Sequence, residues 1–66
     1  MEITVNGEPR EVRDGLDILE LLDTLQLGPG GLVVEVDRDI VERDRFKETR
    51  LNPGARVELV RLVGGG

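Results

Sequence analysis

The sequence predicts a mixed α+β fold in which a single helix covers one face of a four- to five-stranded sheet. Three features indicate it: an Asn-Gly pair between two strand-like segments near the start, one leucine-rich segment with helical spacing, and alternating apolar segments in the second half. The 66 residues suffice for one domain, near the lower size at which a chain folds without a metal or disulfides.

The first two strands are predicted to form a hairpin. Residues 1–6 alternate between apolar and polar side chains. Asn6-Gly7 is the strongest short signal for a type I′ turn, in which both central residues have positive φ. Residues 8–13 then return as the second strand. We expect it at the edge of the sheet, because Pro9 lacks the backbone donor that a central strand needs.

The helix is predicted from its start signal, its apolar face and its stop signal. Asp17 and Glu20 have the spacing of a capping box. Gly28 is the expected left-handed residue at the C-terminal end, and Pro29 blocks continuation. The segment between them is apolar on one face, which we interpret as core packing, through Ile18, Leu21, Leu22 and Leu25.

Two strands are predicted after the helix. Residues 32–37 form a strand with alternate apolar side chains, and a turn around Asp37 and Asp39 leads into a short strand at residues 40–41. We interpret both aspartates as turn residues, because the acidic residues are scattered among arginines without the spacing of metal ligands.

The remaining elements are an irregular helical turn and the last strand. Residues 42–48 are highly charged around Phe46, which indicates a turn of helix held by one buried ring. Asn52-Pro53-Gly54 predicts a type II turn, because proline fixes φ and glycine accepts the positive φ that follows. The last strand, residues 56–63, has no turn signal that pairs it with its predecessor, so insertion beside the first strand is the alternative.

Composition argues against several classes of function. Without cysteine and histidine, the chain has no thiol nucleophile, no disulfide framework and no zinc-finger ligands. A net charge of −5 and a single aromatic residue argue against a nucleic-acid partner. No segment has the length and hydropathy of a membrane span or a secretion signal, so we expect a soluble cytoplasmic protein. We expect no enzyme, no metal and no bound cofactor.

The three last glycines are the candidate functional segment. Glycine has no Cβ, so Gly64 and Gly65 can thread a channel that is too narrow for larger side chains. The carboxylate of Gly66 is then the candidate for covalent modification. The simpler alternative is a frayed terminus.

An apolar pair directly before the glycines is a second candidate feature. If Val57 and Leu59 face the helix, strand alternation places Val60 and Leu62 on the opposite, open face of the sheet. There they could form a docking patch that positions the tail in a partner enzyme. The alternative is ordinary scattered surface hydrophobicity.

The whole chain resembles the ThiS family of sulfur carriers, which have the ubiquitin-like β-grasp fold and are related to MoaD. The specific parts are the glycine ending and an Ile-Val-x-Arg segment at residues 40–43, alongside the Asn-Gly hairpin and the leucine-rich helix. Family members commonly carry asparagine at the position of Asp37 and often tryptophan at that of Phe46; both differences are conservative. The resemblance implies a β-grasp domain at residues 1–63 and a flexible tail at residues 64–66.

The resemblance also implies a carrier that partner enzymes act on. In this family the terminal carboxylate, here on Gly66, is adenylated with ATP by a ubiquitin-activating-like adenylyltransferase of the ThiF type. Sulfur from a donor such as a cysteine desulfurase displaces AMP and leaves a thiocarboxylate. Thiazole synthase, of the ThiG type, takes that sulfur for the thiazole ring of thiamine.

Two alternatives remain open at the level of sequence. The same tail chemistry could serve another acceptor, such as molybdopterin synthesis or tRNA thiolation. The chain could also be a β-grasp interaction module or protein-conjugated modifier without a sulfur role, in which case removal of Gly66 leaves function intact or Gly66 becomes joined to lysines of other proteins.

Overall fold

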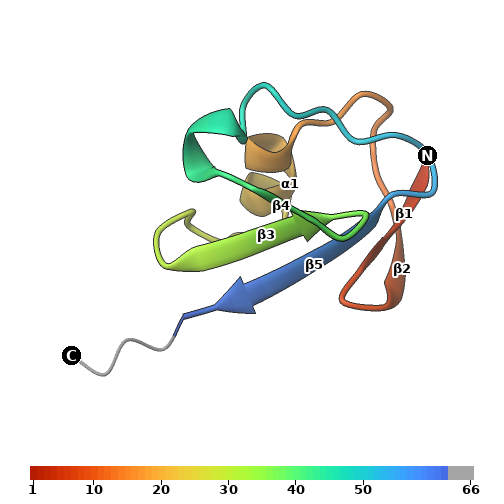
Figure 1. The fold of residues 1–66 in the computed structure, drawn as a ribbon. Coiled ribbons are helices and arrows are strands. Elements are labelled where there is room, and N and C mark those ends of the chain that lie inside the picture. Colours follow the sequence, from red (N-terminus) through yellow and green to blue (C-terminus); the bar gives the residue numbers. More distant parts are fainter. Residues whose placement is uncertain (63–66) are drawn as a thin grey trace.

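The computed structural model describes residues 1–62, which form one mixed five-stranded sheet with a helix on one face (Figure 1). The sheet order is β2-β1-β5-β3-β4, so the last strand lies in the centre. The predicted α+β class is therefore confirmed. In chain order the elements are β1 (Glu2–Val5), β2 (Glu8–Glu11), α1 (Ile18–Thr24), β3 (Leu32–Val36), β4 (Asp39–Val41), the 3-10 helix η1 (Arg43–Arg45) and β5 (Arg56–Arg61).

β1 and β2 form the predicted antiparallel hairpin. Asn6 has φ 51° and Gly7 has φ 83°, as a type I′ turn requires. All four residues of β2 are exposed and the strand lies at one edge of the sheet, where Pro9 is tolerated. β2 ends at Glu11, two residues before the predicted end.

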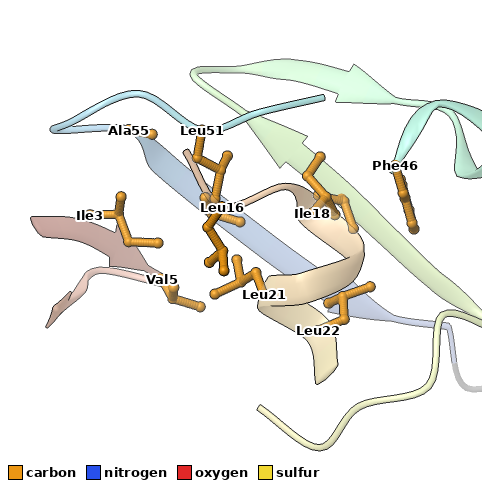
Figure 2. Packing of buried hydrophobic residues seen from close by; sticks show 11 residues of the cluster. Ile3, Val5, Leu16, Ile18, Leu21, Leu22, Phe46, Leu51 and Ala55 are labelled. Atoms are coloured by element: carbon orange, nitrogen blue, oxygen red, sulfur yellow. The ribbon is translucent and has the colours of Figure 1, made fainter. Parts of the chain in front are cut away.

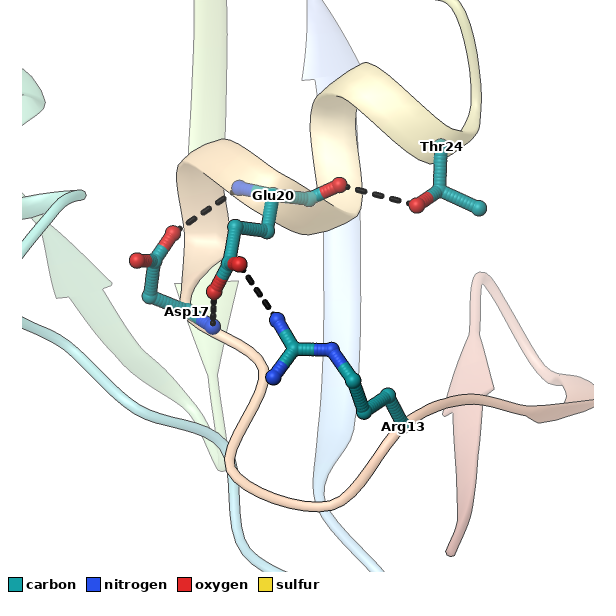
Figure 3. A network of polar contacts seen from close by, with 4 residues as sticks. All are labelled: Arg13, Asp17, Glu20 and Thr24. Atoms are coloured by element: carbon teal, nitrogen blue, oxygen red, sulfur yellow. Dashed lines mark hydrogen bonds and ion pairs between the residues drawn. The ribbon is translucent and has the colours of Figure 1, made fainter.

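The predicted capping box opens α1 (Figure 3). The Asp17 carboxylate accepts a hydrogen bond from the Glu20 backbone N–H at 2.8 Å, and the Glu20 carboxylate accepts one from the Asp17 N–H at 3.1 Å. Arg13 donates to the second oxygen of the same Glu20 carboxylate. The two capping bonds satisfy backbone N–H groups at the start of the helix. The Arg13–Glu20 ion pair joins the preceding loop to the first helical turn.

α1 ends earlier than predicted, and its left-handed residue is Gln26 instead of Gly28. Gln26 has φ 60°, whereas Gly28 has no positive φ. The Gln26 N–H donates to the Asp23 carbonyl at 2.9 Å and the Leu27 N–H to the Leu22 carbonyl at 2.8 Å, the two bonds of a Schellman motif. The prediction was wrong because Leu27 packs back onto the core, which requires the chain to reverse one residue before it.

β3 and β4 form a second hairpin, with Asp37 and Arg38 as its two-residue turn. Their φ values are 51° and 75°, so this turn adopts positive φ without a glycine, at a cost to the folded state. β4 begins one residue before its predicted start. The helical turn after it is confirmed as η1, and Phe46 at its end is only 1% exposed.

The hydrophobic core lies between α1 and the sheet (Figure 2). Fully burying a large apolar side chain stabilises a fold by about 1.5–3 kcal/mol. The sheet supplies one part of this core, and α1, η1 and the connecting loops supply the rest. The face of the sheet that meets α1 is therefore the buried face. The cluster consists of Ile3, Val5, Leu16, Ile18, Leu21, Leu22, Val34, Phe46, Leu51, Ala55 and Val57.

Candidate functional site

The candidate site is built on β5, which pairs in parallel with β1 and antiparallel with β3. The alternative placement considered from sequence, insertion beside the first strand, is the observed one. The predicted Asn52-Pro53-Gly54 turn directly precedes the strand. Gly54 has φ 81°, and the Ala55 N–H donates to the Asn52 carbonyl at 3.0 Å. A central strand has neighbours on both sides, so its path is fixed more firmly than that of an edge strand.

Two turn side chains supplement the backbone ladders of β5. The Asn6 side-chain oxygen accepts a hydrogen bond from the Leu59 N–H at 2.7 Å. On the other side of the strand, the Asp37 carboxylate accepts one from the Arg56 N–H at 2.9 Å. Both residues have positive φ in their hairpin turns. Each turn residue therefore closes its own hairpin and also holds the central strand.

The two faces of β5 differ as the alternation predicted. Val57 is fully buried, and Leu59 is partly buried against the core. Val60 and Leu62 are 52% and 61% exposed. Val60 lies directly opposite Val33 of β3, so the apolar surface continues onto the neighbouring strand. Whether Val60 and Leu62 dock onto a partner stays a prediction.

Sequence reasoning missed Ile40 as a surface residue. It is 66% exposed, more than Val60 or Leu62, and it lies opposite Glu35, which in turn lies opposite Glu58. The signal was present, because alternation with its inward neighbour Val41 points Ile40 outward. We call the sheet surface away from α1 the open face. Its residues include Val33, Glu35, Ile40, Glu58, Val60 and Leu62.

The structure describes the residues up to Leu62, which precede the predicted glycine tail, but not the tail itself. The Leu62 N–H donates to the Gly31 carbonyl at 2.7 Å, and Gly31 itself has φ 69°. β5 ends at Arg61, whereas the prediction carried the strand to residue 63. The predicted threading and modification residues, Gly64, Gly65 and Gly66, lie outside the described residues.

The rest of the described chain offers other surface features. A groove of about 370 Å³ on the helix side is lined in part by Leu25, Leu59, Arg10 and Arg61, on the opposite side of the sheet from Val60. Within residues 1–62, no three acidic side chains converge as metal ligands would. No helix among these residues has the length and apolar character to cross a membrane.

Comparison with known proteins identifies the family. The family model described as "ThiS family" matches residues 3–66. The crystal structure of the thiamine biosynthesis protein ThiS from Geobacter metallireducens is 35% identical, with a TM-score of 0.87 and complete coverage of both chains. Thiazole synthases of Paramagnetospirillum magneticum and Magnetococcus marinus are 29% and 32% identical over the whole of this chain, which spans only 20% of each. With its β-grasp fold, the chain belongs to the ThiS family.

Proposed function

We propose that this chain is a sulfur carrier protein of thiamine biosynthesis, acting in the cytoplasm as a co-substrate of other enzymes. A ThiF-type adenylyltransferase uses ATP to adenylate the carboxylate of Gly66. A donor such as a cysteine desulfurase supplies sulfur, and a ThiG-type thiazole synthase accepts it. Support comes from the family match, which extends through Gly66, and from the likeness to two thiazole synthases.

The chemistry requires activation because a carboxylate is a poor electrophile. A Gly66 carboxylate oxygen attacks the α-phosphorus of ATP, and pyrophosphate leaves. The acyl-adenylate that results has a good leaving group, so the outer sulfur of a donor persulfide attacks its carbonyl carbon and AMP departs. A thiol then cleaves the S–S bond of the acyl disulfide, which forms a disulfide with the donor and releases the carrier's sulfur. The product is a thiocarboxylate whose sulfur is nucleophilic. All catalytic groups for these steps belong to the partner enzymes, and the carrier contributes the reacting carbonyl.

The observation that carries the proposal is the exposed apolar pair at the end of the central strand. Val60 on β5 and Leu62 directly after the strand are 52% and 61% exposed, just before Gly64, Gly65 and Gly66 in the sequence. Docking through this pair would bring the glycines, which follow two to four residues after Leu62 in the sequence, close to a partner's active site. Gly64 and Gly65 then give the clearance to thread a narrow channel, because neither has a Cβ.

Intact mass spectrometry of the protein purified from its own host tests the chemistry. We expect a fraction of the molecules to carry sulfur in place of one oxygen, localised to Gly66 by fragmentation. A second test deletes Gly65 and Gly66: the truncated chain should keep its thermal transition and lose adenylation. If the truncated chain still supports growth of a strain that depends on it for thiamine, the carrier proposal is wrong.

The acceptor is tested separately from the tail chemistry. The thiocarboxylate form, offered to purified thiazole synthase or to a tRNA thiolation enzyme, should lose its sulfur to the first and keep it with the second. The likeness of this chain to part of two thiazole synthases favours that acceptor. Transfer to the tRNA enzyme alone would leave the carrier chemistry standing and replace the acceptor.

A further inference from the structure

The groove on the helix side of the sheet lies beside the last part of β5. The ladder between β1 and β5 ends at the pair Val5–Val57, whereas β5 continues to Arg61. No residue of β1 therefore pairs with the last four residues of β5, and the helix side is left open there. The groove of about 370 Å³ has an apolar lining that consists of Val5, Leu25, Leu27, Leu32 and Leu59. Its four leucines are only partly buried, so they present apolar surface that the core does not cover.

Three charged residues, Arg10, Arg61 and Glu8, line the same groove. Arg10 lies opposite the buried Ile3, and Arg61 follows the buried Val57 by four residues on one strand. Strand alternation therefore places both arginines on the helix side. The ion pairs within residues 1–62 involve neither of them. In a chain with a net charge of −5, two arginines at one apolar groove favour an anionic occupant.

The spacing of the two arginines requires an elongated occupant. The register of the sheet places Arg10 level with Ala55 of β5, six residues before Arg61. At 3.3 Å per residue their Cα atoms are about 20 Å apart along the strands, and two strand spacings add about 10 Å across the sheet. A small anion does not reach both side chains, whereas five residues of extended peptide span about 17 Å. Glu8 lies between them along the hairpin, which disfavours an acidic group in the middle of the occupant.

We propose that the helix-side groove binds an extended peptide segment of a partner protein, with apolar side chains in its middle and a carboxylate at each end. The apolar side chains contact the four leucines, and the carboxylates pair with Arg10 and Arg61. The groove faces away from Val60, so a partner bound there leaves the exposed apolar pair of the open face accessible. The inference goes beyond the proposed function, because it adds a second partner that the chain binds at the same time.

The test is a methyl NMR titration of the full chain with a synthetic peptide. The peptide has six residues, blocked ends, glutamate at its first and last positions and Ala-Leu-Val-Ala between them. We expect the methyl resonances of the four groove leucines to shift and saturate at millimolar peptide. Those of Val33 and Val60, on the open face, should stay in place. Replacing one glutamate of the peptide with glutamine should weaken binding about 2- to 5-fold, as expected for an exposed ion pair.

Variants of the chain test the two arginines. Arg10→Gln and Arg61→Gln should each weaken binding of the glutamate peptide about 2- to 5-fold. Arg43→Gln is the matched control, because Arg43 is exposed at the start of η1 and does not line the groove. All three variants should bind the peptide with glutamine at both ends as the unaltered chain does. That result separates a lost ion pair from a damaged groove, since damage would weaken both peptides.

Several outcomes would overturn the inference and leave the carrier function standing. One is the absence of saturable leucine shifts, and another is equal affinity for the glutamate and glutamine peptides. If sodium octanoate shifts the four leucines as strongly as the peptide, the groove is a site for a small apolar acid. If these resonances change when residues 63–66 are deleted, the occupant is the chain's own C-terminal segment. If they change on dilution of the free chain, the occupant is a second copy.

Discussion

Replacing Asn6 tests whether β5 is held in place by a side chain from the first hairpin. Asn6 has two structural roles: it adopts φ 51° in the turn, and its side-chain oxygen accepts the Leu59 N–H at 2.7 Å. Asn6→Gly keeps the turn conformation and removes the bond. Asn6→Ala removes the bond and also places an ordinary side chain at positive φ. Asn6→Asp keeps an acceptor and serves as the control.

The expected losses follow from these roles. Because Asn6 is exposed, water partly replaces the lost bond, so Asn6→Gly should lower the free energy of unfolding by about 1 kcal/mol. Asn6→Ala should lower it by about 2 kcal/mol, since the left-handed conformation adds roughly another 1 kcal/mol. In a domain of this size each kcal/mol lowers Tm by about 4–8 °C.

Thermal unfolding followed by far-ultraviolet circular dichroism is the suitable assay, because the chain has no tryptophan or tyrosine for fluorescence. Amide hydrogen exchange by NMR adds a local readout, in which the Leu59 amide should lose protection in Asn6→Gly and keep it in Asn6→Asp. If Asn6→Gly melts with Asn6→Asp and Leu59 exchanges alike in both, the side-chain bond contributes nothing to holding β5. If Asn6→Ala equals Asn6→Gly, the strain argument is wrong.

Three further predictions concern the other turns and the apolar pair. Gln26→Gly should raise the urea midpoint by the equivalent of about 0.5 kcal/mol, because glycine adopts φ 60° without strain; an unchanged or lower midpoint contradicts this. Arg38→Gly should stabilise by a similar ~0.5 kcal/mol for the same reason, and a loss of stability would show that the arginine side chain has a structural role. Changing Val60 and Leu62 together to Asp should abolish detectable binding to the adenylyltransferase while shifting Tm by less than about 3 °C; a large drop in Tm would mean that these side chains support the core.

The elements that local chemistry specifies were predictable from sequence. Asn6-Gly7 identified its hairpin because few residues other than Asn and Gly adopt the φ values that a type I′ turn needs. The Asp17–Glu20 capping box identified the helix start, since both halves of that motif lie within four residues. The exposure of Val60 followed from the two-residue period of strands. Each of these signals depends only on neighbours in the chain.

The features that failed or were missed depend on tertiary packing. The position of the helix end was decided by Leu27, which has to reach the core; the glycine signal at Gly28 carries no information about that contact. The exposure of Ile40 depended on which face of β4 meets the core. The opposition of Glu35 and Glu58 depended on the register between β3 and β5, which lies beyond the reach of a local pattern.

The contacts of Asn6 and Asp37 show how local and long-range requirements meet in the same residues. Each residue is favourable for its own turn, yet each also bonds to β5, across 53 residues for Asn6 and 19 residues for Asp37. An asparagine or aspartate in the turn is therefore worth more to this fold than a glycine, because glycine supplies the φ but no acceptor. Since β5 carries Val60 and leads to Leu62, these two bonds stabilise the surface on which the proposed docking depends. The proposed carrier function requires such a fixed strand, because a partner enzyme would position the carbonyl of Gly66 from the structured surface that precedes it in the chain.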